Sequence, residues 1–230
     1  MKVAWLFFGL PRSPAFSAAH FSRLMGLYDS KVFAHFWTCN EKGKEIYVKR
    51  ECEIKKGQPT VTNSTHSDAI EEFKRLYSPT KIFTEPCSEA LLEHPEPSPN
   101  LYRPFFGQCS SKRVLSLIDP YAFDLIVKSR TDVVVHPKEI RELKILNSDA
   151  LHVLGTFIDP NGRKYPRVND TFMYGSPVVM SKVVSMVDEY WEQEEYCQSN
   201  IHFALAAHCE RNSIPVVLVG GPASGRKIGK

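Results

Sequence analysis

Short apolar runs alternate with amphipathic segments along this chain, and this alternation limits the possible fold more than any other feature. Apolar runs typical of β-strands lie at residues 3–8, 31–37, 80–86, 123–127, 151–158, 171–177 and 214–221. Helical patterns fill the intervals at residues 15–28, 67–77, 101–119, 178–193 and 200–212. Strands that alternate with helices predict an α/β fold, with a mostly parallel open sheet and helices on both faces.

The remaining segments are expected to be irregular. Residues 41–65 are polar and predict a loop or an exposed edge element, and proline-rich residues 93–100 predict a loop. Residues 159–171 are also expected to form a polar loop. The helix at 67–77 is predicted to begin with Ser67 or Asp68 as its N-cap.

We expect one domain over residues 1–222, followed by a basic flexible tail at 223–230. A single domain agrees with the chain length of 230 residues. Arg226 and Lys227 in the tail are candidates to fold over a diphosphate, although a disordered tail is the simpler interpretation.

Composition excludes several classes of protein. The formal net charge of +3 is too small to predict nucleic-acid binding, which requires a clustered basic face. The six cysteines have no zinc-site spacing and are expected to be reduced thiols. No apolar run approaches the roughly 20 residues of a membrane span, so a cytoplasmic protein without a transmembrane segment is expected.

Charged residues interrupt the apolar stretch "FDLIVKSRTDVVVHP" at residues 123–137. In an open α/β sheet, ligands bind beyond the carboxyl ends of the strands. A strand here would deliver Arg130 and Asp132 to that edge on the same face, because side chains two apart share a face. A guanidinium matches phosphate, and a carboxylate binds a divalent cation or a ribose hydroxyl. The pair predicts a nucleotide diphosphate site, with a surface salt bridge in a turn as the alternative.

Four motifs in order resemble a group of viral and bacterial glycosyltransferases with a nucleotide-diphospho-sugar-binding, GT-A-type fold. The matching residues are Gly9, Pro11 and Arg12; Tyr28, Asp29, Val32, Phe33, His35 and Trp37; Gln108 and Lys112; Phe123, Asp124, Ile126, Val127, Arg130 and Asp132; and Asn169, Asp170, Phe172, Gly175, Ser176 and Met180. The resemblance implies a GT-A-like, Rossmann-like sheet. It also implies transfer of a sugar from a nucleotide-diphospho-sugar donor to a hydroxyl of a glycan or glycoprotein, in the host cytoplasm if the protein is viral.

The resemblance also assigns candidate roles. Donor binding is expected from the turn after the first strand and from the charged stretch, namely Gly9, Leu10, Pro11, Arg12, Lys128, Arg130 and Asp132. Sugar or acceptor contacts are expected from Trp37, Tyr102, Gln108 and Asn169. His35 is expected to orient a loop, and His202 is expected to be structural.

A metal ion, Mn²⁺ or Mg²⁺, is implied through Asp132, which would occupy the second carboxylate position of a DxD motif. Arg130 stands at the first position, so the motif is incomplete. A guanidinium beside a cation site would repel the ion. Arg130 would then neutralise the departing diphosphate itself.

Asp170 is the candidate general base for an inverting displacement, with Asp159 as its competitor. A retaining enzyme would not need this base, and an Asn-Asp pair is also common as a loop cap.

Two other functions stay open. The stretch "FFGLPRSPAF" resembles the phosphosulfate loop of sulfotransferases, although Pro14 and Ala15 replace the expected donor residues. The incomplete DxD motif also allows a carbohydrate-binding module without catalysis.

Overall fold

The computed structural model describes residues 1–39, 46–51, 60–93, 102–133, 140–154, 168, 170–189, 201–219 and 227–228. The strands are β1 (Lys2–Gly9), β2 (Asp29–Trp37), β3 (Ile46–Glu51), β4 (Thr60–Thr65), β5 (Lys81–Glu85), β6 (Leu125–Ser129), β7 (Leu151–Leu154), β8 (Phe172–Gly175), β9 (Val216–Val219) and β10 (Lys227–Ile228). The helices are α1 (Pro14–Met25), α2 (His66–Tyr77), α3 (Ser88–Glu93), α4 (Tyr102–Leu115), α5 (Pro177–Val184), α6 (Met186–Glu189) and α8 (Ile201–Arg211), with a 3₁₀ turn at Pro120–Ala122.

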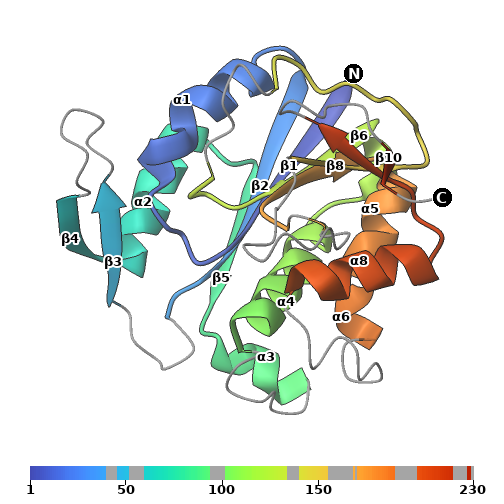
Figure 1. The fold of residues 1–230 in the computed structure, drawn as a ribbon. Helices are drawn as coiled ribbons and strands as arrows, with labels where there is room; N and C mark the ends of the chain where they lie inside the picture. Colours follow the sequence, from blue (N-terminus) through green and yellow to red (C-terminus); the bar gives the residue numbers. More distant parts are fainter. Residues whose placement is uncertain are drawn as a thin grey trace.

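The central sheet is open and mostly parallel, in the order β10-β9-β7-β8-β6-β1-β2-β5 (Figure 1). Strand β1 pairs in parallel with both β2 and β6, β2 pairs in parallel with β5, and β7 with β9. Strand β8 is antiparallel to both of its neighbours, and β10 is antiparallel to β9. This architecture confirms the predicted α/β fold with a mostly parallel open sheet.

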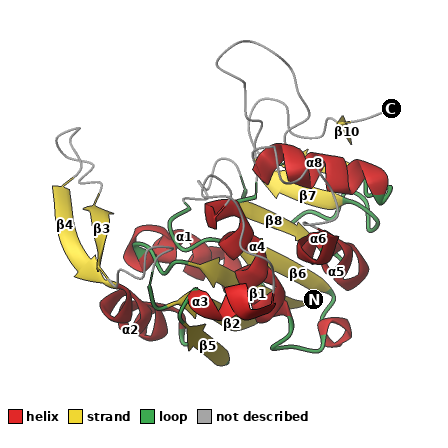
Figure 2. Cartoon of the chain, turned by 90° about the horizontal axis from the view of Figure 1, so that it is seen from below, coloured by secondary structure: helices red, strands yellow, loops and turns green. Residues whose placement is uncertain are grey.

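Helices cover both faces of the sheet, as predicted. Along β1, Trp5 and Phe7 point to the layer that contains α1 and α2, and Leu6 and Phe8 point to the layer of α4, α5 and α8. All four of these side chains are at most 2% exposed. Because successive side chains of a strand point to opposite faces, the apolar residues of β1 contribute to two hydrophobic cores. Figures 1 and 2 show the helices on either side of the sheet.

Aromatic rings fill the core beneath α1 and α2. Phe7 meets Phe21 and Phe73 edge-on, with ring centroids 5.2 Å apart in each pair. Phe73 stacks on Tyr77 with centroids 4.5 Å apart. Such pairs add about 0.5–1.5 kcal/mol each to the burial of their surface, so this face forms a rigid support for the turns at the end of β1.

The polar segment 41–65 contains more regular structure than a loop. Strands β3 and β4 form an antiparallel hairpin that is separate from the main sheet and lies beside α2 (Figures 1 and 2). The predicted helix at 178–193 is interrupted at Ser185 and gives α5 and α6, while residues 190–193 lie outside the described part. The predicted loop at 94–100 and most of 159–171 also lie outside it.

Two compositional expectations can be compared with the described residues. None of their helices is long and apolar enough to cross a membrane. The described cysteines carry thiols rather than disulfides, and they are Cys39, Cys87, Cys109 and Cys209.

The N-cap of α2 differs from the prediction. Thr65, rather than Ser67 or Asp68, is the cap, and its side chain accepts a hydrogen bond from the backbone N–H of Asp68 at 3.0 Å. The Asp68 carboxylate accepts in return from the Thr65 backbone at 3.3 Å. This reciprocal capping box needs an acceptor three residues after the cap, which Asp68 supplies.

We predict that Thr65→Ala lowers the free energy of unfolding by about 1 kcal/mol, because the backbone N–H of Asp68 loses its side-chain acceptor. Glu71→Ala is the matched control on the same helix. It removes only the exposed ion pair with Lys74 and should change stability by less than about 0.5 kcal/mol. Urea denaturation measures the free energy of unfolding of both variants. An equal loss of stability in Thr65→Ala and Glu71→Ala would contradict the capping role of Thr65.

Candidate active site

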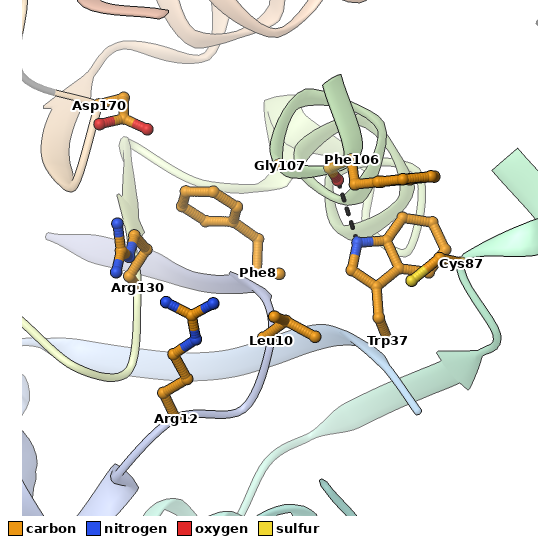
Figure 3. A pocket seen from close by; sticks show the side chains of 10 residues that line it. Phe8, Leu10, Arg12, Trp37, Cys87, Phe106, Gly107, Arg130 and Asp170 are labelled. Atoms are coloured by element: carbon orange, nitrogen blue, oxygen red, sulfur yellow. Dashed lines mark hydrogen bonds between the residues drawn. The ribbon is translucent and has the colours of Figure 1, made fainter. Parts of the chain in front are cut away.

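A cavity of about 250 Å³ opens at the carboxyl ends of β1 and β6. From β1 the chain proceeds outward to β2 and β5 and then returns to β6 on the other side of β1. This change of direction is the switch point where open α/β sheets bind ligands. The cavity is lined by Phe8, Gly9, Leu10, Arg12, Trp37, Cys87, Phe106, Gly107, Arg130 and Asp170 (Figure 3).

The turn after β1 begins at Gly9, whose φ of 90° is strained for any residue with a side chain. Its backbone N–H donates to the Ser110 hydroxyl of α4 at 2.7 Å. The same hydroxyl lies 2.7 Å from Nδ1 of His35 on β2. A strand, a helix and a turn thus meet at one serine, which fixes the backbone beside the cavity.

His35 is buried and neutral. Burial, and secondarily the charge of Arg113, lower the pKa of His35 to about 3. Its Nε2 lies 3.1 Å from Oε1 of Glu85, which also pairs with Arg113. Because that carboxylate accepts, the proton of the neutral ring belongs on Nε2, and Nδ1 is an acceptor beside the Ser110 hydroxyl, which also lies 3.0 Å from the His35 carbonyl oxygen as a donor. This arrangement supports the predicted orienting role of His35.

The turn after β6 is bonded directly to the turn after β1. The Thr131 hydroxyl donates to the Arg12 carbonyl oxygen at 2.7 Å, and the Ser17 hydroxyl donates to the Thr131 carbonyl oxygen at 2.6 Å. The N–H of Arg130 donates to the Thr171 carbonyl oxygen at 3.0 Å. Segments far apart in sequence therefore hold the cavity rim in one arrangement.

Arg130 and Asp132 form a salt bridge in a turn, as in the alternative interpretation of this stretch, and not a pair on one face of a strand. Strand β6 ends at Ser129, so both residues lie in the following turn and strand alternation does not place them. Nε and Nη2 of Arg130 donate to the two carboxylate oxygens of Asp132 at 2.9 and 2.5 Å. Arg130 also lines the cavity, whereas Asp132 does not.

This bidentate pair does not fit a hard-cation site. Both oxygens of Asp132 already accept from a guanidinium, which would repel a cation. Among the described residues, no cluster of three His, Cys, Asp or Glu side chains could hold a metal. The side chains around Asp132 therefore do not fit the metal ion that the resemblance implies.

Asp170 lines the cavity opposite the turn after β1 (Figure 3). Its Oδ1 lies 3.5 Å from Nδ1 of His202 on α8. The same nitrogen is 3.1 Å from the Val168 carbonyl oxygen, and the Val168 N–H donates to the His202 carbonyl oxygen at 3.2 Å. The first turn of α8 thus contacts Val168 and Asp170 and holds them in place.

Lys128 lies behind the cavity wall rather than in it. Its side chain is 0% exposed, and its Nζ lies 4.3 Å from the centroid of the Phe8 ring. Burial lowers the pKa of Lys128 to about 8, and the charge of Asp170 acts in the opposite direction.

The other wall of the cavity is apolar. Figure 3 shows Trp37, Cys87 and Phe106 on the side away from Arg12 and Arg130. Trp37 is 1% exposed, and its Nε1 donates to the Phe106 carbonyl oxygen at 3.0 Å. Buried apolar side chains therefore close this side of the cavity, and charged side chains line the other.

The remaining predicted residues lie elsewhere or outside the described part. Gln108 is 1% exposed and Pro11 is buried, and neither lines the cavity. Tyr102 begins α4, but its side chain is not described, and Asp159 and Asn169 lie outside the described residues. The predictions missed the cavity contacts of Cys87, Phe106 and Gly107, because a helical pattern does not show which sheet edge a helix end reaches.

Comparisons with known proteins give no close relative. No family model matches the chain, and no curated protein matches it. One solved structure from Desulfovibrio desulfuricans G20, described as a "putative nucleotide-diphospho-sugar transferase", is similar over 94% of this chain and 78% of its own. The identity is 9% and the TM-score is 0.44.

We predict that His35 makes stability depend on pH. The unfolded histidine takes up a proton near pH 6.5, but the folded one does so only near pH 3. Stability is therefore complete above pH 6.5 and falls as the pH drops toward 3, by at most about 1.4 kcal/mol per pH unit. The stability difference between wild type and His35→Gln, measured by urea denaturation, should be larger at pH 7 than at pH 4. A constant difference would contradict a neutral buried His35.

Proposed function

We propose that the protein transfers a sugar from a nucleotide-diphosphate donor to a hydroxyl of a glycan or glycoprotein. The observation that carries this proposal is the cavity at the switch point between β1 and β6, with two arginines on one side and buried aromatic side chains on the other. Arginine forks match phosphate oxygens, and an apolar wall suits the less polar part of a nucleotide. The similar structure from Desulfovibrio desulfuricans bears a name of the same class but is too distant to add weight.

In this proposal, Arg12 and Arg130 bind the diphosphate. Arg130 is held rigidly because Asp132 occupies one edge of its guanidinium. The charges of Asp132 and Asp170 counteract the burial of Arg130, and its pKa is raised above the ordinary arginine value. Arg130 therefore stays cationic and can neutralise the negative charge that develops on the leaving diphosphate.

Asp170 is the general base of the proposed reaction. Its carboxylate takes the proton of the acceptor hydroxyl, and the oxygen attacks the anomeric carbon of the sugar. The bond from that carbon to the diphosphate breaks, and the diphosphate leaves with the electron pair. His202 is a positioning residue, since its contacts with Val168 and Asp170 fix where the carboxylate points.

The proposal also includes the other properties that the glycosyltransferase resemblance implies. These are transfer of a hexosyl or deoxyhexosyl group, a viral or bacterial source and a cytoplasmic location. A Mn²⁺ or Mg²⁺ ion at Asp132 would first have to displace Arg130, so we propose that donor binding does not require one.

A thermal-shift screen tests the proposed class. One nucleoside diphosphate or its sugar should raise the melting temperature of the wild type, because a ligand of the native state stabilises it. Arg130→Ala should remove the shift, and Arg75→Ala, at the end of the distant helix α2, should retain it. A shift with adenosine bisphosphate alone would support a sulfotransferase. No shift with any nucleotide would support a binding module.

We predict that the shift persists in EDTA, because arginines rather than a cation meet the diphosphate. The test measures the change in melting temperature caused by the nucleotide, in EDTA, Mg²⁺ or Mn²⁺, for the wild type and for Asp132→Asn. Loss of the shift in EDTA, with recovery by Mn²⁺ in the wild type only, would instead establish Asp132 as a metal ligand.

We predict that Asp170→Asn lowers the turnover of the bound donor by about 10²-fold or more, while the thermal shift by the donor is retained. His202→Ala should lower kcat, and His202→Asn should recover part of it, because the Asn amide can donate in place of Nδ1. Full activity of Asp170→Asn would exclude the base role.

A further inference from the structure

Lys128 is a buried ammonium without a hydrogen-bond acceptor among the described residues. It lies within β6, is 0% exposed, and Nζ makes no hydrogen bond there. Buried polar groups are nearly always hydrogen-bonded, and the charge of Asp170 offsets only part of the cost of burying this ammonium, since the pKa of Lys128 stays lowered. The position therefore calls for an explanation other than packing.

One aromatic ring separates this ammonium from the cavity. Phe8 lines the cavity, and Nζ of Lys128 lies 4.3 Å from the centroid of its ring. The ring is backed by α4, with Cε2 of Phe8 4.0 Å from the place where a side chain on Gly107 would begin. Attraction to the ring offsets only part of the lost hydration of the ammonium.

Lys128 adds positive charge beside the cavity. Among the described residues that line the cavity, Arg12 and Arg130 are positively charged and Asp170 is negatively charged, whereas Asp132 pairs with Arg130 and does not line it. The ammonium of Lys128 therefore increases the positive charge next to a cavity that is proposed to receive a diphosphate of two or more negative charges.

We propose that Lys128 is a third cation for the diphosphate, reached past Phe8 when the ligand enters the cavity. The inference rests on the proposed function and specifies its anion site. The flexible side chain of lysine can turn toward the ligand around the edge of the Phe8 ring. The ligand oxygens then supply the acceptors that the ammonium lacks in the described structure.

This role differs from a structural one in a measurable way. A buried cation that serves ligand binding lowers the stability of the free protein. Burial disfavours the charged form of Lys128 and lowers its pKa to about 8. Replacement by an apolar side chain of similar volume removes that cost. Lys128→Met should therefore raise the melting temperature of the free protein by a few degrees and weaken anion binding.

The test is calorimetric titration with inorganic pyrophosphate, together with the melting temperature of the free protein. Lys128→Met should bind pyrophosphate about tenfold more weakly than wild type or worse, because a charge-assisted hydrogen bond is lost. Lys128→Gln serves as a second neutral variant if the methionine variant does not fold. Lys112→Met is the control, since it removes the same charge from an exposed lysine that pairs with Asp188.

Each outcome decides between the two proposals. Weaker pyrophosphate binding by the Lys128 variants, with normal binding by Lys112→Met, supports the inference. Equal binding by wild type and Lys128 variants overturns it and leaves the proposed function intact. A wild type that binds neither pyrophosphate nor any nucleoside diphosphate overturns both.

Discussion

The parallel pairing of β1 with both β2 and β6 is the constraint on which the site depends. Because β1 is shared, the turns that follow β1 and β6 leave the sheet at the same edge and side by side. Thr131 then bonds one turn to the other through the Arg12 carbonyl oxygen. Ser110 and His35 hold the start of the first turn from beneath. A register slip of one residue would reverse the faces of β1 and remove Phe8 from the cavity.

The chemistry of the site follows from how its charges are balanced. Arg130 is fixed by Asp132, and Asp170 is fixed by the first turn of α8. Each of these side chains is held by neighbours rather than by the ligand, which reduces the conformational entropy lost on binding. Preorganised charges of this kind act on developing charge in a transition state without further rearrangement. The buried ammonium of Lys128 adds a further positive charge behind the ring of Phe8.

Local pattern was sufficient for most of the central sheet and for part of the site, but not for the hairpin of β3 and β4 or for the short helix α3. Apolar runs predicted the strands from β1 to β9 that belong to the central sheet, and the position of residues after β1 and β6 placed Gly9, Arg12 and Arg130 at the cavity. Contacts between distant segments could not be inferred in this way. The hydrogen bond between Ser110 and His35 spans 75 residues, and the clamp of His202 on Asp170 joins two segments that have no shared pattern. The pairing of Arg130 with Asp132 depends on where β6 ends, which periodicity alone left uncertain by a few residues.

The central claim is that the cavity between the β1 and β6 turns receives the diphosphate of a sugar donor. A crystal structure of the wild type, grown with the nucleoside diphosphate that stabilises it most, tests this most directly. The account predicts diphosphate density between the guanidinium groups of Arg12 and Arg130, with the base against the aromatic wall of Trp37 and Phe106. A nucleotide bound at any other part of the surface, with this cavity unchanged, would contradict it.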